Sequence, residues 1–421
     1  MISRRLPYAT DYLTLTQSRS LRLILADFLP SSGPVTKKIT NRRWVKSAPL
    51  SPTHHLVYFP NVSPSSFLLA DGTDSWHAPG PPFTRRMWAG GTMAFLQDIQ
   101  TDGQPFHCTQ TIDHVQVKGM EGEEKIFVRV KRVIFAGRFP GELKGQRNAG
   151  LRITEQRTLV FMRDNRQQGS LAVGQSPSKV LKPTQTPDFS HTMVPTRELL
   201  FQFSALTLNA HAVHLDRQFC REIEGHRNLL VHGPLTVVLM IEVLRSHLQT
   251  LVDQSSSSLE TTPEQIVYVE YRNLAPLYAD EEMRICVKRR EKEVIGGPEN
   301  WDIWIEGRDG GYAVKGTAKT SSGIDVSGRR FKRSRSQRAM LGHGIAPQES
   351  ILQGDGIPQE EVAFQNAIHE GNETVSTEES SLEEEAAIEE KAERETELEA
   401  EKEAEEEAEE EAEEIAPDFR R

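Results

Sequence analysis

The stretch from Phe203 to Pro234, FSALTLNAHAVHLDRQFCREIEGHRNLLVHGP, places a polar loop with two histidines directly ahead of an apolar helix that opens with Gly-Pro. Pro234 suits the first helical turn, because its missing N–H has no partner to lose there. The Gly233 amide then points out of the helix start beside the positive end of the helix dipole, where an oxyanion can bind. This arrangement favours chemistry on a carbonyl group.

The elements that follow this loop are expected to hold it in place. The helix is apolar on nearly every side from Leu229 to Leu248, so we expect other structure to wrap around it. Four segments after it are β-branched or aromatic and partly alternating, with turn residues between them. They are Ile266 to Arg272, Met283 to Lys288, Trp301 to Glu306 and Tyr312 to Lys319. We expect them to form an antiparallel meander folded round the helix.

The first half of the chain repeats this order. Met87 to Ile99 is interpreted as a shorter apolar helix, and strands are predicted at Phe106 to Val117, Lys125 to Phe135 and Gly150 to Met162. Two helix-then-sheet units suggest a duplication. We expect the two units to pack as a pseudo-dimer, with their sheets in one continuous layer and both helices on the same face.

Several spaced motifs resemble those of one enzyme family, the MaoC-like (R)-specific hydratases and, among them, the hydroxyacyl-thioester dehydratases of type 2. The resemblance covers roughly residues 50 to 320. Its motifs are HHLVYFP at His54 to Pro60, GPPFTRRMWAGG at Gly80 to Gly91, LVFMRD at Leu159 to Asp164, FSALTLNAHAVHLD at Phe203 to Asp216 and LLVHGPL at Leu229 to Leu235. It implies an α+β double hot-dog fold, with two antiparallel sheets each wrapped round a central helix.

The resemblance also implies an activity and a cellular place. Such enzymes are lyases (hydro-lyases) that dehydrate (R)-3-hydroxyacyl thioesters to trans-2-enoyl thioesters, in fungi as part of mitochondrial fatty acid synthesis. The implied partner is an acyl thioester of coenzyme A or of acyl carrier protein, and no cofactor is expected. The chain is expected to be a monomeric pseudo-dimer or a homodimer in the mitochondrion.

The same resemblance assigns the catalytic residues to His214, Asn209 and Gly233. The family pattern has an aspartate five residues before its catalytic histidine, whereas Asn209 stands five residues before His214. Asparagine cannot carry a proton, so one titrating group has to serve. His214 would take the C2 proton and return it to the departing hydroxyl, Gly233 N–H would hold the enolate-like oxygen, and the Asn209 amide would orient the hydroxyl.

Arg85, Arg86 and His232 are the candidate substrate-binding residues. The two arginines could meet the phosphates of coenzyme A or of phosphopantetheine, and they could equally pair with carboxylates. His232 could cap or pack beside the oxyanion site. Gly90 and Gly91 are expected to permit close packing of the first-half helix rather than to bind phosphate, since no G-x-G-x-x-G follows a strand.

Structural readings of the loop residues remain open beside these roles. His214 could be a satisfied histidine, Asn209 could form an Asx turn, and Asp216 could be a helix N-cap rather than a substitute acid. His211 and His214 lie three residues apart, but no carboxylate or cysteine at ligand spacing completes a metal set, so no metal is expected.

Composition divides the 421 residues into five expected segments. Residues 1–50 are a presequence and basic extension, 51–165 a degenerate N-terminal hot-dog unit, 166–195 a linker, 196–325 the catalytic hot-dog unit, and 326–421 a charged low-complexity tail. Few acidic residues accompany the arginines among the first 25 residues, which is compatible with a mitochondrial presequence.

The tail separates the charge of the whole chain from that of its catalytic part. Glu378 to Glu414 holds 21 glutamates against three cations, so the remainder of the chain is net positive although the total is −11. A mildly basic body suits acidic thioester carriers. The acidic tail is expected to be solvated helix or disorder, and the basic run Arg329 to Arg338 is interpreted as a linker rather than as a nucleic-acid site.

Cysteine and hydropathy patterns limit the remaining classes of protein. Cys108, Cys220 and Cys286 are scattered, which fits free buried thiols better than disulfides or a zinc site. No run approaches 18 uncharged apolar residues, so no membrane span is expected. Two further functions stay open beside dehydration: hydration of a short dicarboxylic enoyl-CoA such as mesaconyl- or itaconyl-CoA, which a cation in the acyl tunnel would favour, and catalytically silent binding of acyl thioesters.

Overall fold

A computed structural model describes residues 8–30, 47–137, 150–163, 180–254, 264–291 and 298–321, together with residues 4 and 6. The strands are β1 Ala9–Thr14, β2 Arg85–Phe95, β3 Asp102–Lys118, β4 Lys125–Ala136, β5 Leu151–Met162, β6 Phe189–Met193, β7 Gln265–Asn273, β8 Met283–Arg289, β9 Glu299–Glu306 and β10 Tyr312–Ser321. The helices are α1 Leu15–Ile24, α3 Arg197–Thr207 and α4 Gly233–Gln254, with short turns η1 His54–Val57, η2 Ser65–Phe67, η4 Ala212–His214 and η5 Phe219–Ile223.

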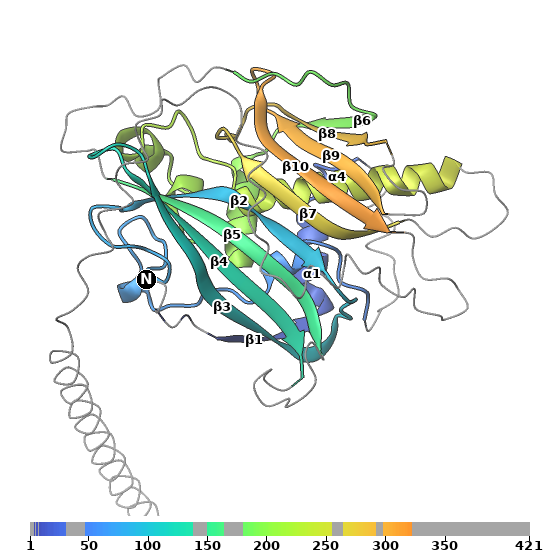
Figure 1. Ribbon diagram of the computed structural model, residues 1–421, viewed down its shortest axis with the longest axis horizontal. Helices are drawn as coiled ribbons and strands as arrows, with labels where there is room; N and C mark the ends of the chain where they lie inside the picture. Colours follow the sequence, from blue (N-terminus) through green and yellow to red (C-terminus); the bar gives the residue numbers. More distant parts are fainter. Residues whose placement is uncertain are drawn as a thin grey trace, which may run out of the picture. The chain divides into compact units, whose positions relative to one another are not determined.

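All ten strands form one antiparallel sheet in the order β1-β3-β4-β5-β2-β7-β10-β9-β8-β6 (Figure 1). From one edge to the middle the order is β1-β3-β4-β5-β2, and from the other edge it is β6-β8-β9-β10-β7. Each strand of one half therefore has a counterpart in the other half. The two halves are related by a pseudo-twofold axis between β2 and β7. The expected continuous layer of two hot-dog units is therefore confirmed. Within the second half, β8, β9 and β10 form a meander, while β7 pairs with β10 rather than with β8.

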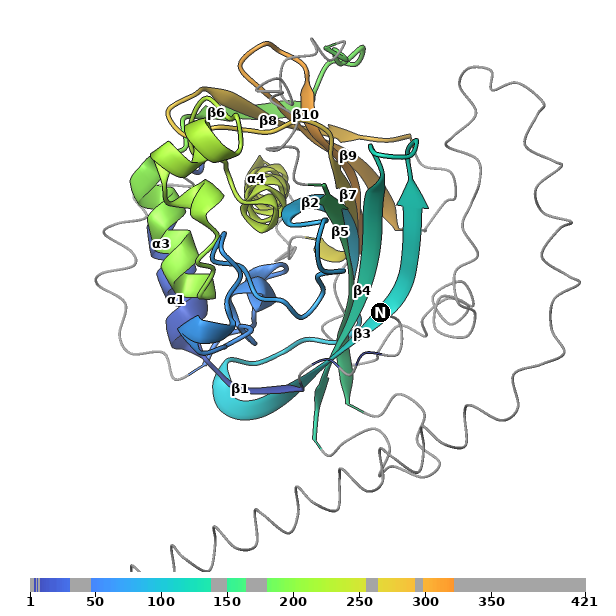
Figure 2. The same cartoon turned by 90° about the vertical axis from the view of Figure 1, so that its left-hand side faces the viewer.

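Helix α4 lies in the hollow of the curved second half (Figure 2). Its side chains are buried on almost every side, and they pack on β8, β9, β6 and β2. The buried positions are Leu235, Thr236, Val237, Val238, Leu239, Met240, Ile241, Val243, Leu244 and Leu248. The predicted wrapped helix is thus confirmed, and its burial is the main apolar contribution to this half because it removes nearly the whole helix from water.

The predicted helix over Met87 to Ile99 is wrong, because this segment forms strand β2 at the centre of the sheet. Two glycines explain the difference, since each costs a helix about 1 kcal/mol relative to alanine. In the strand they permit close backbone contact: a Cβ on Gly90 would lie 2.2 Å from Tyr271 O, and one on Gly91 would lie 2.2 Å from Gln156 O. The expected close packing at Gly90 and Gly91 is therefore found, but it is between neighbouring strands and not around a helix.

The first half has no long helix like α4 within the described residues. Its hollow is filled by α1, α3 and the short turn η1 (Figure 2). Ser18 Oγ of α1 lies 2.7 Å from His54 Nδ1, and His54 Nε2 lies 3.2 Å from Glu242 Oε1 of α4. Burial lowers the pKa of His54, so this buried chain of hydrogen bonds carries a neutral imidazole between the two helices.

Residues 9–25 belong to this fold, although we expected them in a presequence. Strand β1 pairs with β3, and Leu13, Leu21 and Leu25 are fully buried. Strand β6 likewise extends the sheet from within the expected linker, pairing with β8. Edge strands as short as these have weak sequence signals, and their neighbours in the sheet decide them. Residues 31–46 of the expected basic extension, the run Arg329 to Arg338 and the acidic tail lie outside the described residues.

The role of α1 in the core leads to a stability prediction. Leu21→Ala should lower the free energy of unfolding by about 2 to 5 kcal/mol, because it leaves a cavity in a closed core. Leu23→Ala on the same helix is the matched control, since Leu23 is 45% exposed while Leu21 is 0% exposed. Denaturant unfolding of both variants measures the difference. Equal, small losses would mean that α1 is not part of the cooperative fold.

Candidate active site

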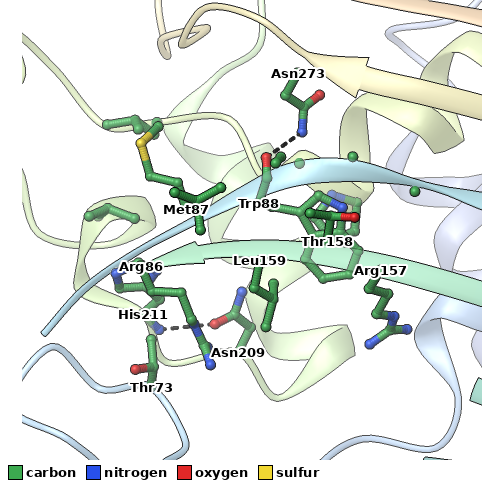
Figure 3. Close-up of a pocket in the computed structure, with 18 of the residues that line it drawn as sticks. Thr73, Arg86, Met87, Trp88, Arg157, Thr158, Leu159, Asn209, His211 and Asn273 are labelled. Carbon is green, nitrogen blue, oxygen red and sulfur yellow. Dashed lines mark hydrogen bonds between the residues drawn. The ribbon is translucent and has the colours of Figure 1, made fainter. Parts of the chain in front are cut away.

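A cavity of about 920 Å³ opens between the two halves of the molecule. Its walls come from β2, β5 and β7, from the loop between α3 and η4, and from the start of α4. Figure 3 shows the strand residues Trp88, Arg157 and Leu159 facing Asn209 and His211 across it. The sequence-predicted residues His214, Asn209, Gly233 and Arg86 all line this cavity.

His214 is held as a neutral base at one wall. Its Nδ1 lies 2.8 Å from Leu230 O. A carbonyl oxygen only accepts hydrogen bonds, so Nδ1 carries the proton and Nε2 carries the lone pair. Burial lowers the pKa of His214 to about 4, with the Leu230 hydrogen bond opposing that shift. The Nε2 lone pair is therefore free to take a proton at neutral pH.

His232 supports His214 and does not contact the cavity. It is fully buried, it stacks on His214 with ring centroids 3.6 Å apart, and its Nε2 lies 2.8 Å from Ser204 Oγ of α3. Burial holds its pKa well below the ordinary value. The expected substrate contact of His232 is therefore not supported, and the alternative of packing beside the oxyanion site fits the structure.

Asn209 forms the Asx turn that we left open as its structural alternative. Its Oδ1 accepts the backbone N–H of His211 at 3.1 Å (Figure 3). Its backbone N–H donates to Ser204 O at 2.9 Å, just beyond the left-handed residue Leu208 that ends α3. Asn209 lines the cavity with its Oδ1 held in this turn, while its amide nitrogen has no such partner among the described residues and is the group best placed to meet a substrate.

Gly233 begins α4 at a point where no side chain fits. A Cβ there would lie 2.8 Å from Trp88 Cβ and 2.9 Å from Asn273 Nδ2. Asn273 Nδ2 donates to Trp88 O at 2.8 Å, so the end of β7, the start of β2 and the start of α4 are joined (Figure 3). Among the described residues no acceptor is found for Gly233 N–H, which leaves it to bind an oxyanion from the cavity.

The deeper wall carries charge that the sequence did not indicate. Arg157 lies over the Trp88 ring, 5.0 Å from its centroid, and bonds to Glu155 Oε1 at 2.5 Å. Arg132 Nη1 donates to Glu155 Oε2 at 3.1 Å. Burial alone would raise the pKa of Glu155, but Arg157 and Arg132 hold it well below its ordinary value. Two cations against one carboxylate give this wall a net positive charge.

The two predicted substrate arginines differ in position. Arg85 does not line the cavity; its Nη2 lies 2.7 Å from Glu224 Oε2, which is the carboxylate pairing that we kept open. Arg86 does line the cavity, and its Nη1 lies 3.5 Å from Asp74 Oδ2. Both begin strand β2 rather than preceding a helix. Only Arg86 therefore remains a candidate for binding the phosphates of a thioester carrier.

Other expected properties can be stated for the described part of the chain. Cys108, Cys220 and Cys286 are free and buried, as expected. No group of three or more histidine, cysteine or acidic side chains there has the arrangement of a metal site. Helix α4 is long and apolar enough to cross a membrane by length and composition, but more than half of that stretch is buried inside the protein, as in the core helix of a globular fold.

Asp71 and His211 were missed as a pair by sequence reasoning. Asp71 Oδ2 lies 3.4 Å from His211 Nε2, although the two residues are far apart in the sequence and no motif links them. Trp88 was missed because its segment was assigned to a helix. Asn273 was missed with it, because its role is to bond to Trp88 O. Strand alternation in RRMWAGG could have placed Trp88 on the cavity face.

The arrangement can move one proton beside a stabilised oxyanion. A neutral imidazole, a free helix-start N–H and an amide surround one cavity, which is what proton removal next to a thioester carbonyl requires. No group in this set is suited to hydride or phosphoryl transfer.

Comparison with known proteins agrees with this chemistry. The family model of hydroxyacyl-thioester dehydratase type 2 matches residues 53–279, more than half of the chain. A mesaconyl-C(4)-CoA hydratase of Chloroflexus aurantiacus is 30% identical over 274 residues, which are 65% of this chain and 84% of that protein. The mitochondrial hydroxyacyl-thioester dehydratase type 2 of Schizosaccharomyces pombe is 27% identical over 312 residues, 70% of this chain and 91% of that protein.

The fold is also found among solved structures. A MaoC-like dehydratase from Phytophthora capsici superposes with a TM-score of 0.50 at 11% identity, covering 77% of this chain and 98% of that one. This likeness concerns the fold alone and agrees with two hot-dog units in one chain. With the family match over residues 53–279, it follows that the chain belongs to the hydroxyacyl-thioester dehydratase type 2 family of enzymes.

Proposed function

We propose that the protein dehydrates (R)-3-hydroxyacyl thioesters to trans-2-enoyl thioesters, with His214 as the acid/base and Gly233 N–H as the oxyanion donor. The observation that carries this proposal is that a neutral His214 and Gly233 line the same cavity. In the reaction, His214 Nε2 takes the C2 proton while Gly233 N–H stabilises the charge that develops on the thioester oxygen. The protonated ring then returns that proton to the departing hydroxyl.

We place the substrate carrier and the cellular site within the same proposal. Arg86 lines the cavity, and we assign to it the contact with a phosphate of coenzyme A or of acyl carrier protein. The relatives from Schizosaccharomyces pombe and Saccharomyces cerevisiae are named mitochondrial, which supports a mitochondrial location. Pairing of the two halves within one chain supports a monomeric pseudo-dimer, with a homodimer as the alternative.

The base is tested directly by substitution. His214→Ala should lower the turnover of 3-hydroxybutyryl-CoA, or of crotonyl-CoA in the reverse direction, by at least about 100-fold, which is the usual contribution of general acid–base catalysis. His114→Ala is the control, since His114 is exposed on β3 and does not line the cavity. Absorbance of the enoyl thioester follows both reactions. Near-normal turnover by His214→Ala would favour another base, and no turnover by the unsubstituted protein would favour a silent acyl-thioester binder.

The pH profile tests the neutral state of His214. Its neutral form is the base, so activity is lost as pH falls through the pKa, which burial lowers to about 4. We therefore expect kcat/KM for crotonyl-CoA to stay level from about pH 8 down to about pH 5.5. An acid limb near pH 6.5, the pKa of an unperturbed histidine, would contradict this assignment.

The folded state has to be checked across the same pH range. Burial lowers the pKa of several other histidines, so the unfolded chain binds more protons than the folded one; they are His54, His55, His77, His211 and His232. The free energy of unfolding should therefore be highest above about pH 6.5 and fall as pH drops below it. Circular dichroism at each pH separates loss of the fold from protonation of His214.

A second candidate function is favoured by the cationic wall of the cavity. We propose hydration of a short dicarboxylic enoyl-CoA as the alternative, because Arg157 and Arg132 outnumber Glu155 there. Arg157 contacts the Trp88 ring, and Trp88 lies against Gly233. A substrate whose thioester oxygen binds at Gly233 and whose distal carboxylate reaches past the Trp88 ring would therefore meet the guanidinium of Arg157. The relative named mesaconyl-C(4)-CoA hydratase agrees with this alternative.

Arg157→Met separates the two candidates. If the substrate carries a distal carboxylate, the variant should lose about 10-fold or more in kcat/KM for mesaconyl-CoA, as expected for loss of a charged contact, with little change for crotonyl-CoA. If the substrate is a plain acyl chain, crotonyl-CoA should be the better substrate of the unsubstituted enzyme, and the variant should keep that order. Competition between the two thioesters in one reaction gives the ratio directly.

A further inference from the structure

The loop after η2 is locked against the loop that carries the active-site histidines. Ala212 N donates to Asp71 O at 2.8 Å. Gly72 has a positive φ of 81°, and a Cβ on it would lie 2.2 Å from Ala210 O. Only glycine fits this backbone conformation at such a close approach. Asp71, from the first half of the chain, is thereby fixed beside the loop of the second half.

The Asp71 carboxylate is oriented by its own loop. Its Oδ1 accepts hydrogen bonds from Thr73 N at 2.9 Å and from Thr73 Oγ1 at 2.6 Å. Its Oδ2 is left to face His211 Nε2 at 3.4 Å. This separation is longer than a strong hydrogen bond, but both side chains are nearly buried, at 10% and 11% exposure, so the Asp71 carboxylate is an acidic group held directly beside the ring.

The pairing determines which nitrogen of His211 faces the substrate. A carboxylate attracts the protonated nitrogen, so the neutral ring carries its proton on Nε2 and its lone pair on Nδ1. Burial, with smaller contributions from His214 and Arg86, holds the pKa of His211 well below its ordinary value. Within the described part of the chain, Nδ1 meets no protein partner. His211 lines the cavity, and its ring centroid lies 5.4 Å from that of His214, at 83° to it.

We propose that His211 is a second catalytic residue of this site, whose Nδ1 accepts the hydrogen bond of the substrate's 3-hydroxyl, and that Asp71 is the positioning residue that presents this lone pair. This role rests on the proposed dehydration. Asn209 then serves to hold His211, through the hydrogen bond from His211 N to its Oδ1. The residue that meets the hydroxyl is thus two positions beyond the asparagine that stands where the family pattern has an aspartate.

The proton and electron balance is unchanged by this second residue. His214 Nε2 takes the C2 proton, the C2–H electrons form the C2=C3 double bond by way of the enolate, and the C3–O bond breaks. The proton on His214 passes to the leaving oxygen, which departs as water. His211 neither gains nor loses a proton; by accepting the O–H hydrogen bond it makes the oxygen more basic and holds it toward His214. In hydration the same contact activates the attacking water.

The test uses a cycle of variants in the full-length protein, with the kcat of crotonyl-CoA hydration as readout. His211→Ala and Asp71→Asn should each lower kcat by about 10- to 100-fold, the range between loss of an orienting contact and loss of an acid–base partner. Asp71→Asn presents an N–H to the ring, so it should turn Nδ1 into a donor. The double variant should be no worse than His211→Ala alone by more than about twofold, because Asp71 acts through His211.

Two further variants separate the role in catalysis from a role in folding. His211→Asn should keep more activity than His211→Ala, because the asparagine oxygen can occupy the place of Nδ1. Asp102→Asn is the control for Asp71→Asn: its Oδ1 also accepts the N–H two residues ahead, at 3.1 Å from Gln104 N, but it is exposed and away from the cavity. It should leave kcat unchanged. Free imidazole should restore part of the turnover of His211→Ala.

The outcomes separate the role of His211 from the proposed dehydration. No turnover by the unsubstituted protein would overturn the proposed function and the role of His211 with it. Full turnover of the unsubstituted protein together with a His211→Ala kcat within about twofold of it would overturn only the role of His211. Losses that multiply in the double variant would overturn the action of Asp71 through His211.

Discussion

The antiparallel pairing of β2 with β7 is the interaction on which the rest of the molecule depends. It joins the two halves of the sheet at Gly90, where β2 and β7 approach too closely for a side chain, while Gly91 allows the same close approach between β2 and β5. The same pairing brings Trp88 against the start of α4 and lets Asn273 bond to Trp88 O. A side chain at Gly90 would push β7 away from β2, and one at Gly91 would push β5 away from β2, so the walls of the cavity would lose their geometry.

The two halves use the same topology for different purposes. In the second half, a long apolar helix fills the hollow of the sheet and begins at Gly233, which lines the cavity. In the first half, the space is filled by α1, α3 and η1, and the sheet there carries a buried ionic group in which Arg132 and Arg157 hold Glu155. Removing Glu155 from this group would leave uncompensated buried charge, at a cost of about 3 to 5 kcal/mol. The second half thus carries His214, and the first half supplies the opposite wall of the cavity.

Burial gives the histidine cluster its chemistry. His211, His214 and His232 lie in contact, and each is largely removed from water, so the charged form of each is disfavoured. Three adjacent imidazoles can stay neutral together, whereas three imidazolium ions could not. Their neighbours then assign the tautomers: a hydrogen bond to Leu230 O fixes His214, and the Asp71 carboxylate, 3.4 Å from Nε2, orients His211. These neutral histidines are therefore suited to proton transfer.

The sequence by itself determined the elements whose patterns are strong and local. Seven strands were predicted close to their observed bounds, and so was the buried helix after Gly-Pro, because alternation and continuous apolarity depend only on neighbours in the chain. The positions of His214, Asn209 and Gly233 in one cavity followed from the same stretch. Tertiary structure alone decided that Met87 to Ile99 is a central strand, that residues 9–25 belong to the core, and that His232 is buried support. It also decided the partnership of Asp71 with His211 and the neutrality of His214, because burial and contacts between distant segments exist only once the two halves have closed on each other.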